Sequence, residues 1–256
     1  MTSAVETRTE TLQSELEAAA AARLFFAHHS VGQNLLDGVR ELSAHHRVAL
    51  TVAPAAPARA GAGPAWLETS GGRNKDPRSK IDDFVEKVTA GADAESELAF
   101  LKLCYVDFNP VTDVDGLFAY YDQAISALKR RRPDLKIGHV TVPLTVEPRD
   151  LKSRLRRVLG RQVWEDVANV RRYEFNRRLR ERFAADPIFD LARAEATQPD
   201  GTRQTFQLGG RAYDSLVPSY TDDGGHLNGL GQRLLGIQMV RFVAAALQRP
   251  AAGASP

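Results

Sequence analysis

The sequence of 256 residues has few of the features that mark specialised classes of protein. It contains one cysteine, Cys104, which excludes an intramolecular disulfide and a zinc site built from several cysteines. No stretch approaches 18 uninterrupted apolar residues, so the pattern of a transmembrane helix is absent. The formal net charge is +2 at pH 7, and a value this small does not by itself indicate a nucleic acid or a membrane as partner. We therefore expect no nucleic acid and no membrane among the partners.

The N-terminal segment also lacks the pattern of a secretory signal. Residues 1–22 carry acidic side chains where such a signal has a basic region followed by an apolar core. If Met1 is the natural start, we expect a cytoplasmic protein. The single cysteine suits the reducing conditions of that compartment.

What the sequence does have is an alternation of strand-like and helix-like segments. It is 43% hydrophobic and 26% charged, which is ordinary for a globular protein. Apolar runs of strand length predict strands at Arg23–His28, Val48–Ala53, Leu98–Val106, Lys136–Val142 and Pro187–Leu191. Helical spacing or composition predicts helices over 5–22, Val31–Ser43, a segment entered through Ser79 as N-cap, Phe118–Arg131, 151–183 with a break near Gly160, and Leu227–Leu247. This order predicts a parallel sheet with helices on both faces.

We see no linker that would divide the chain into two large parts. We expect an N-terminal helix over 1–22, a single domain over 23–248 and a flexible tail over 249–256. The Pro/Ala/Gly-rich stretch at 54–64 predicts an irregular loop, and the sequence leaves open whether it forms a lid.

Ligands of open parallel sheets bind at the carboxyl ends of the strands, so the polar residues that follow the predicted strands are the candidates for a site. They are His28, His29 and Ser30, then Gly72 and Asn74, then Asp107 and Asn109, then Thr145, and finally Asp222, Asp223 and His226. This set contains the members of a Ser-His-Asp triad. Loops at strand ends are polar in most proteins, so position alone leaves a purely structural interpretation open.

The C-terminal stretch "YTDDGGHLNGLGQ" is more specific. Two glycines separate Asp223 from His226, and such a turn can bring the carboxylate to one imidazole nitrogen. The other nitrogen is then free to take a serine proton. The alternative is a plain turn followed by a helix N-cap. Ser30 has the same ambiguity, because a helical pattern begins at Val31 and a serine there could be only its N-cap.

The segments "FFAHHSVGQNLLDG" and "DGGHLNGLGQ" resemble the SGNH hydrolase superfamily, a group of esterases also called GDSL-like. "GGRNKDPRSKIDDF", "KLCYVDF" and "VTVPLT" are similar to a bacterial branch of it in which the first block reads HxSVG. The resemblance runs from about residue 24 to residue 245. It implies a three-layer α/β/α, flavodoxin-like fold around a mostly parallel five-stranded sheet. It also implies Ser30 as nucleophile, His226 as base, Asp223 as the acid of the triad, and no cofactor.

The chain departs from the family pattern at two places. His28 and His29 precede the serine where the family has Gly-Asp, and Val106 stands where the family has an asparagine that donates into the oxyanion hole. A hydrolase needs such donors, each contributing about 3–4 kcal/mol to lowering the barrier. The candidates are the backbone N–H groups of Ser30 and Gly72 and the side-chain amide of Asn74, which could instead cap a turn.

Four other residues have less specific expectations. His29 lines the pocket or bonds a carbonyl group, and Asp107 braces the loop of Ser30 by accepting backbone N–H bonds. We expect no metal, because His28 and His29 are adjacent in a strand and point to opposite faces. We interpret Cys104 as a small core residue.

Residues 151–183 hold eleven Lys and Arg but four Asp and Glu. This excess could bind an anionic ligand such as an acyl carrier protein, a phosphate-bearing substrate or nucleic acid. The favoured interpretation is a solvated helix face, because apolar residues at helical spacing supply a buried stripe. These are Val163, Val167, Val170, Phe175 and Leu179.

The sequence therefore predicts a serine esterase that hydrolyses a short acyl ester, such as an acetyl ester, of a carbohydrate or small molecule. An intracellular O-acyltransferase that uses the same triad is one alternative. A binding protein with a weakened site is another, favoured by the missing asparagine. The expected partner is the ester substrate, and the oligomeric state is open.

Overall fold

The fold is described from a computed structural model, which places residues 2–55, 63–92 and 95–249. Its centre is a six-stranded parallel sheet with the order β2-β3-β1-β4-β5-β6. The strands are β1 Arg23–Ala27, β2 Val52–Pro54, β3 Ala65–Thr69, β4 Leu98–Leu101, β5 Lys136–Val140 and β6 Ile188–Phe189. The prediction of a parallel α/β fold is confirmed, with six strands in place of five.

The strand that the sequence analysis missed is β3, which pairs with both β1 and β2. The predicted strand at Val48–Ala53 is displaced and becomes β2. The apolar run at Leu98–Val106 is not one strand, because β4 ends at Leu101 and the chain then forms the 3-10 turn η1, Tyr105–Asp107.

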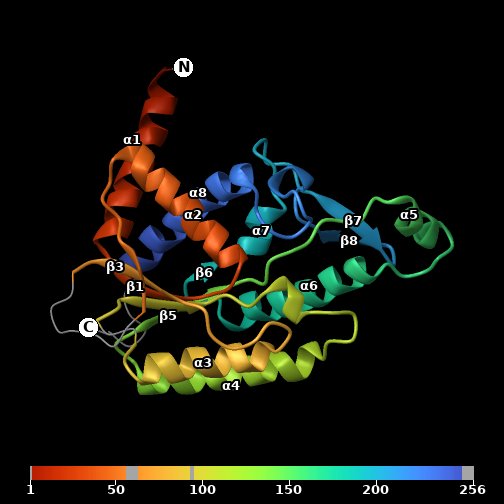
Figure 1. The fold of residues 1–256 in the computed structure, drawn as a ribbon, viewed down its shortest axis with the longest axis horizontal. Coiled ribbons are helices and arrows are strands. Elements are labelled where there is room, and N and C mark those ends of the chain that lie inside the picture. The colour runs from red at the N-terminus through yellow and green to blue at the C-terminus, as the bar shows by residue number, and fades with distance from the viewer. Residues whose placement is uncertain (1, 56–62, 93–94, 250–256) are drawn as a thin grey trace.

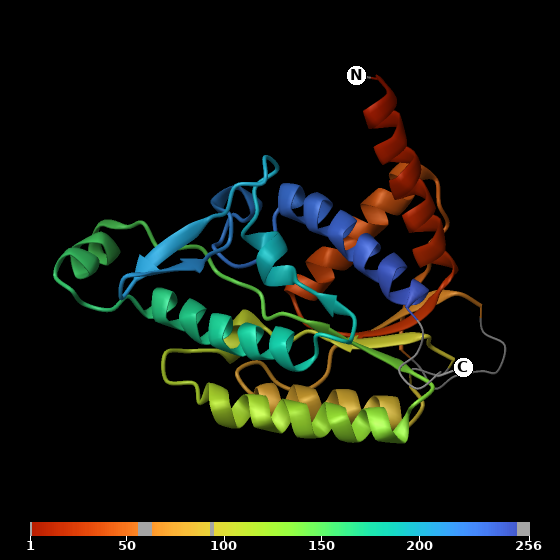
Figure 2. The same ribbon diagram turned by 180° about the vertical axis from the view of Figure 1, so that it is seen from behind.

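Helices cover both faces of the sheet (Figures 1 and 2). One face carries α1 Thr2–Ala21, α2 Val31–His46 and α8 Gly229–Gln248, and the other carries α3 Pro77–Thr89, α4 Val114–Arg131 and α6 Trp164–Arg182. The predicted break near Gly160 separates α6 from a short helix, α5 Leu151–Val158. The remaining elements are α7 Leu191–Glu195, the 3-10 turn η2 Pro218–Tyr220, and a hairpin of β7 Thr205–Leu208 and β8 Arg211–Asp214 that the sequence analysis did not predict. None of the helices in the described part of the chain is long and apolar enough to span a membrane.

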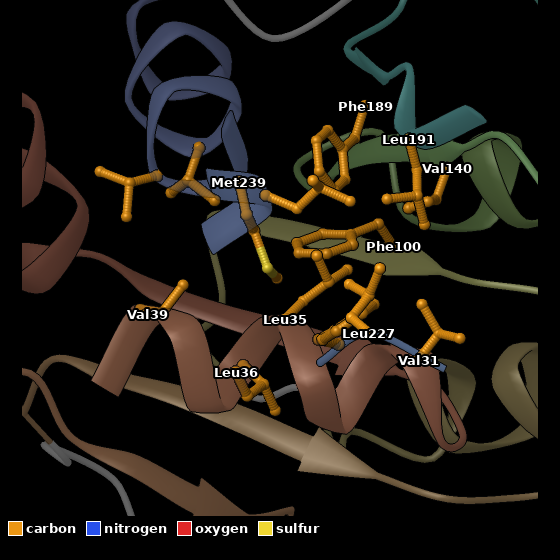
Figure 3. Packing of buried hydrophobic residues seen from close by; sticks show 14 of the residues in the cluster. Val31, Leu35, Leu36, Val39, Phe100, Val140, Phe189, Leu191, Leu227 and Met239 are labelled. Carbon is orange, nitrogen blue, oxygen red and sulfur yellow. The ribbon is translucent and has the colours of Figure 1, made fainter. Parts of the chain in front are cut away.

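The contact between α2 and α8 positions the two ends of the candidate site. Gly38 and Gly236 lie at this crossing, where a Cβ on Gly38 would lie 1.9 Å from the Gln232 carbonyl oxygen. Figure 3 shows Leu35 of α2 and Met239 of α8 converging on Phe100 of β4. Ser30 immediately precedes α2, and His226 lies shortly before α8. This packed pair of helices therefore positions both residues.

The structure describes the predicted N-terminal helix but only part of the predicted loop at 54–64 and of the predicted C-terminal tail. The second half of α1 packs on the domain, since Leu16 and Ala19 are buried and the Trp66 indole donates to the Ala19 carbonyl at 2.8 Å. Most of the loop predicted at 54–64 and all but Arg249 of the predicted tail lie outside the described residues.

Candidate active site

Ser30 lies at the junction between β1 and α2. Its backbone has φ 34° and ψ −90°, a conformation that residues with a Cβ rarely adopt and that costs about 1–3 kcal/mol. It occupies the N-cap position of α2, as one interpretation of the sequence predicted, but its side chain makes no capping hydrogen bond. Ser30 is exposed. Its hydroxyl is therefore not used to stabilise the helix.

The turn before α8 holds Asp223 against His226. Asp223 Oδ2 accepts a hydrogen bond from His226 Nδ1 at 2.6 Å, and Oδ1 accepts the backbone N–H groups of Gly225 and His226 at 2.9 and 2.8 Å. The side-chain bond from His226, helped by these backbone bonds, holds the pKa of Asp223 well below its usual range. Because an ionised carboxylate can only accept, His226 Nδ1 is the donor in this bond, and Nε2 is the nitrogen that a neutral ring would leave with a lone pair. An imidazole held in this way by a carboxylate has the arrangement that general base catalysis uses.

Tyr105, the first residue of η1, contacts the same imidazole. Its hydroxyl lies 3.4 Å from His226 Nε2 and 3.5 Å from Nδ1, and the two rings meet edge to face with centroids 5.6 Å apart. Burial, followed by the charge of Asp223, raises the pKa of Tyr105, so its hydroxyl stays protonated and can donate. Gly225 permits this contact, since a Cβ there would lie 2.7 Å from Tyr105 Cζ.

Arg172 of α6 also contacts Tyr105. Its Nε donates to the Tyr105 carbonyl at 3.1 Å, and its Cζ lies 5.8 Å from the centroid of the Tyr105 ring. Nη1 donates to the Thr145 hydroxyl at 2.9 Å. Burial lowers the pKa of Arg172 to about 10, which leaves it charged at neutral pH. Arg172, one of the cations of residues 151–183, is thus buried and does not lie on the solvated helix face that the sequence predicted.

The buried face of α6 differs from the predicted apolar stripe in a second respect. Val167 and Val170 are half-buried, and polar side chains share the face with the buried apolar ones. Asn169 and Asn176 each use their amide group to bind the chain that follows β5, at Thr145 and Val142. Polar residues on this face were not predicted, because their partners are distant in sequence.

Hydrogen bonds tie the loops at the strand ends to one another. His29 Nε2 donates to the Gly71 carbonyl at 2.7 Å, which joins the turn after β1 to the turn after β3. The Leu227 N–H donates to Asn34 Oδ1 at 3.1 Å, and this bond places the residue after His226 on the first turn of α2. Ser30 and His226 therefore lie in neighbouring loops, although no hydrogen bond joins them within the part of the chain that the structure describes.

Asp107 lies beneath these loops in a buried ion pair. Both of its carboxylate oxygens accept from Lys80 Nζ at 2.8 Å, and they also accept the backbone N–H groups of Cys104 at 2.7 Å and Lys75 at 2.9 Å. Asp107 thus braces the loop of residues 70–76 and the η1 turn, whereas the sequence analysis expected it to brace the loop of Ser30. Lys80 was not predicted as part of the site.

The predicted oxyanion donors lie in or beside the same loops. Lys80 Nζ also donates to Asn74 Oδ1 at 2.9 Å, so the oxygen end of this amide is fixed and the Nδ2 end has no protein partner among the described residues. The backbone N–H groups of Ser30 and Gly72 make no hydrogen bond within the same residues. Each of the three candidates retains an unused donor. Val106, which stands where the family that the sequence resembles has an asparagine, lies in η1.

His28 points into the protein, where it contacts another polar side chain. Its Nε2 donates to Glu68 Oε2 at 3.0 Å. Burial, with a smaller contribution from the charge of Lys102, lowers the pKa of His28 to about 3, so this contact is a hydrogen bond donated by a neutral ring rather than an ion pair. Glu195 is fully buried, and burial raises its pKa to about 8 although it accepts the Leu144 N–H at 2.6 Å.

Other residues singled out from the sequence have structural contacts. Asn109 Oδ1 accepts the Val111 N–H, and Asp222 Oδ1 accepts from the Asn228 amide, so both stabilise turns. Cys104 is buried, as expected of a core residue. No group of three or more His, Cys, Asp or Glu side chains suited to a metal ion occurs among the described residues. A cavity of about 1130 Å³ lies between α1, α7 and α8, away from Ser30, Asp223 and His226.

The fold is similar to that of a solved lipase/acylhydrolase structure, whereas comparisons of sequence find no match. No family model and no curated protein sequence matches the chain. A lipase/acylhydrolase structure from Enterococcus faecalis is similar with a TM-score of 0.52 at 13% identity, covering 90% of this chain and 100% of that one. A protein assigned to the G-D-S-L lipolytic family from Desulfitobacterium hafniense is similar with a TM-score of 0.45 at 9% identity, covering 86% of this chain and 99% of that one. The first of these likenesses confirms the predicted fold: the chain has the three-layer α/β/α fold of SGNH hydrolases.

Proposed function

We propose that this protein is a serine esterase that hydrolyses a short acyl ester of a carbohydrate or small molecule. The observation that carries the proposal is that Ser30 is exposed, that its hydroxyl does not cap α2, and that it lies next to a loop in which Asp223 orients His226. A nucleophile, an oriented base and unused donors on neighbouring loops are the groups that acyl transfer requires.

In the proposed reaction, Ser30 Oγ attacks the ester carbonyl while His226 Nε2 takes its proton. Asp223 stabilises the imidazolium that forms. Collapse of the tetrahedral intermediate expels the alcohol, which takes the proton from Nε2, and leaves an acyl group on Ser30. Water then attacks this acyl group while His226 Nε2 takes its proton, and collapse of the second tetrahedral intermediate releases the carboxylic acid as Ser30 Oγ takes that proton back from Nε2. Proton transfer needs Oγ and Nε2 within about 2.6–3.2 Å, a contact that often closes only when substrate is bound.

Charge on the carbonyl oxygen would be stabilised by the N–H groups of Ser30 and Gly72 and by the Asn74 amide. Lys80 supports the role of Asn74, because its bond to Oδ1 leaves Nδ2 as the end of the amide available to substrate. Tyr105 would act as a positioning residue that holds the imidazole ring. In this proposal Asn74 supplies the side-chain donor that Val106 cannot.

The test is the turnover of p-nitrophenyl acetate and p-nitrophenyl butyrate by the wild type and by Ser30→Ala. We expect the variant to lose at least about 10³-fold in kcat/KM, as removal of an activated nucleophile does. Ser14→Ala, an exposed serine on α1, is the matched control and should retain full activity. Equal rates in wild type and Ser30→Ala would refute the esterase, and wild-type turnover no faster than background would favour the binding protein.

Hydrolysis and acyl transfer share the first half of this reaction and differ in the acceptor. Product analysis of the same assay with added glycerol or a monosaccharide separates them. An esterase yields mainly the free acid, whereas an O-acyltransferase yields mainly the new ester.

A further inference from the structure

Helix α5 stands apart from the layers that surround the sheet. Figures 1 and 2 show it as a projection at one end of the molecule, beyond the start of α6 and close to the β7–β8 hairpin. Asp150 caps it by accepting the Ser153 N–H at 3.0 Å and the Ser153 hydroxyl at 2.6 Å. The helix is therefore a defined element, and its sequence determines what it presents to solvent.

One face of α5 is apolar and uncovered. At 100° per residue, its apolar side chains and that of the following residue fall within an arc of about 100°. Their exposed fractions, together with that of the tryptophan that begins α6, lie between 59% and 84%. These residues are Leu151, Leu155, Val158, Leu159 and Trp164, and we call them the α5 apolar face.

The opposite face of α5 attaches the helix to the protein. Ser153 is buried there, and Arg157 donates to both carboxylate oxygens of Asp166 at 2.8 and 2.9 Å and to the Pro148 carbonyl at 2.8 Å. Asp166 is itself buried. Because this polar anchor holds one side of the helix, the α5 apolar face is kept directed away from the domain.

Unpaired cations border the α5 apolar face. On the helical wheel Arg154 lies at one edge and Lys152 at the other, and Arg161 follows the helix. None of these three makes an ion pair with a described residue. Of the nearby acidic residues, Asp150 is occupied as the N-cap of α5 and Glu147 lies 3.5 Å from Arg157, whereas Glu165 follows Trp164 in the first turn of α6. The border of the face is thus positively charged.

We infer that α5 binds the surface of membranes that contain anionic phospholipids. A short amphipathic helix with leucine and tryptophan on one side and flanking Lys and Arg matches a lipid interface, where apolar side chains enter the acyl boundary and cations meet the head groups. The small net charge of the whole chain gave no reason to expect this partner, because the cations that matter are concentrated beside one apolar face. The inference is independent of the esterase, since none of these side chains belongs to the proposed catalytic machinery.

The test is co-sedimentation of the full chain with vesicles at low salt, using Ser30→Ala protein so that no ester hydrolysis enters the measurement. We expect binding to vesicles of 70% phosphatidylcholine and 30% phosphatidylglycerol, and much weaker binding to pure phosphatidylcholine or in 0.5 M NaCl, because screening weakens exposed charges. Lys152→Gln with Arg154→Gln should lower the partition coefficient about tenfold or more. Arg130→Gln with Arg131→Gln, at the end of α4, removes the same charge from another surface and should have little effect.

A second measurement reports contact with the lipid directly. Trp164 is exposed and Trp66 is buried, so brominated phospholipids should quench the first and spare the second. Leu151→Ser with Leu155→Ser should abolish quenching. The inference is overturned by no sedimentation with anionic vesicles, by equal binding of these α5 variants and the wild type, or by unquenched Trp164. It is also overturned if sedimentation velocity without lipid shows a dimer that these variants dissociate, because the α5 apolar face would then belong to a second copy.

Discussion

Asp107 and Asp223 are held in nearly the same way but have different surroundings. Each carboxylate accepts two backbone N–H groups and one basic side chain, from Lys80 in one case and His226 in the other. The exposed fraction of the side chain is 0% for Asp107 and 57% for Asp223. Hydrogen bonding orients both carboxylates, but only the Asp223–His226 pair is exposed and could reach a substrate. Asp107 therefore holds loops together, whereas the exposure of Asp223 fits the catalytic role that we propose for it.

The largest expected effect comes from Asp223→Asn, which removes the charge but keeps the size of the side chain. The imidazole then loses the partner that fixes its tautomer, and we expect kcat on p-nitrophenyl acetate to fall about 10⁴-fold. The free energy of unfolding should change by less than about 1 kcal/mol, because the pair is exposed. Steady-state kinetics and urea denaturation measure the two quantities. Activity within tenfold of wild type would remove Asp223 from the proposed triad.

Asp107→Ala should produce the reverse pattern, with stability as the property that changes most. It leaves the Lys80 ammonium buried without its partner, and we expect the free energy of unfolding to fall by about 3–5 kcal/mol in urea titrations. Asp107→Leu combined with Lys80→Met removes both charges and should recover much of that loss. A single variant as stable as the wild type would show that the pair does not brace the loops.

Glu195→Gln should change how stability depends on pH. The pKa of Glu195 is about 8 in the folded state and its usual value is 4.5. Between these values the unfolded chain releases the proton while the folded protein keeps it, so the stability of the wild type falls as pH rises through this window, by at most about 1.4 kcal/mol per pH unit. The variant cannot titrate and should lack this fall.

Urea denaturation of wild type and Glu195→Gln at pH 5, 6.5 and 8 measures this difference. The pKa of His28 is lowered, so His28 destabilises the fold as pH falls below its usual value of 6.5, but this contribution is common to both proteins and cancels in the comparison. Parallel stability curves for the two proteins would contradict the raised pKa of Glu195.

The smallest expected effect is that of Tyr105→Phe, which keeps the ring against His226 and removes the hydroxyl. One neutral hydrogen bond contributes about 0.5–1.5 kcal/mol, so kcat should fall roughly two- to tenfold with KM little changed. A shift in the pH profile of kcat/KM should accompany it, because the hydroxyl contacts the proposed base. Loss of the same size in Asp223→Asn and Tyr105→Phe would contradict the different roles assigned to them.

The sequence was most informative where local pattern determines structure. The run RLFFA became β1, and the helical pattern from Val31 became α2. The sequence did not predict β3, a five-residue strand that follows a Pro/Ala/Gly-rich stretch. This strand is recognisable mainly through its pairing with the two neighbouring strands. The β7–β8 hairpin had a usable local signal, because Gly209 and Gly210 form a two-residue turn with positive φ at both positions.

The candidate site was predictable in its motifs but not in its supports. Ser30, Asp223 and His226 stand in short segments whose residue types suggest the chemistry. Lys80 and Arg172 carry no such local signal, since Lys80 meets Asp107 across 27 positions and Arg172 meets Tyr105 across 67. In the sequence, Lys80 and Arg172 have the pattern of solvated cations. In the fold they are buried and support the loops, and their burial depends on the whole fold.

Ser30 is the proposed nucleophile, and covalent labelling with a fluorophosphonate tests this role most directly. The wild type should gain one adduct by intact mass, located by peptide mapping on Ser30. Ser30→Ala should gain none, and Ser14→Ala should label as the wild type does. An adduct of equal yield in Ser30→Ala, or one located on another residue of the wild type, would contradict the account.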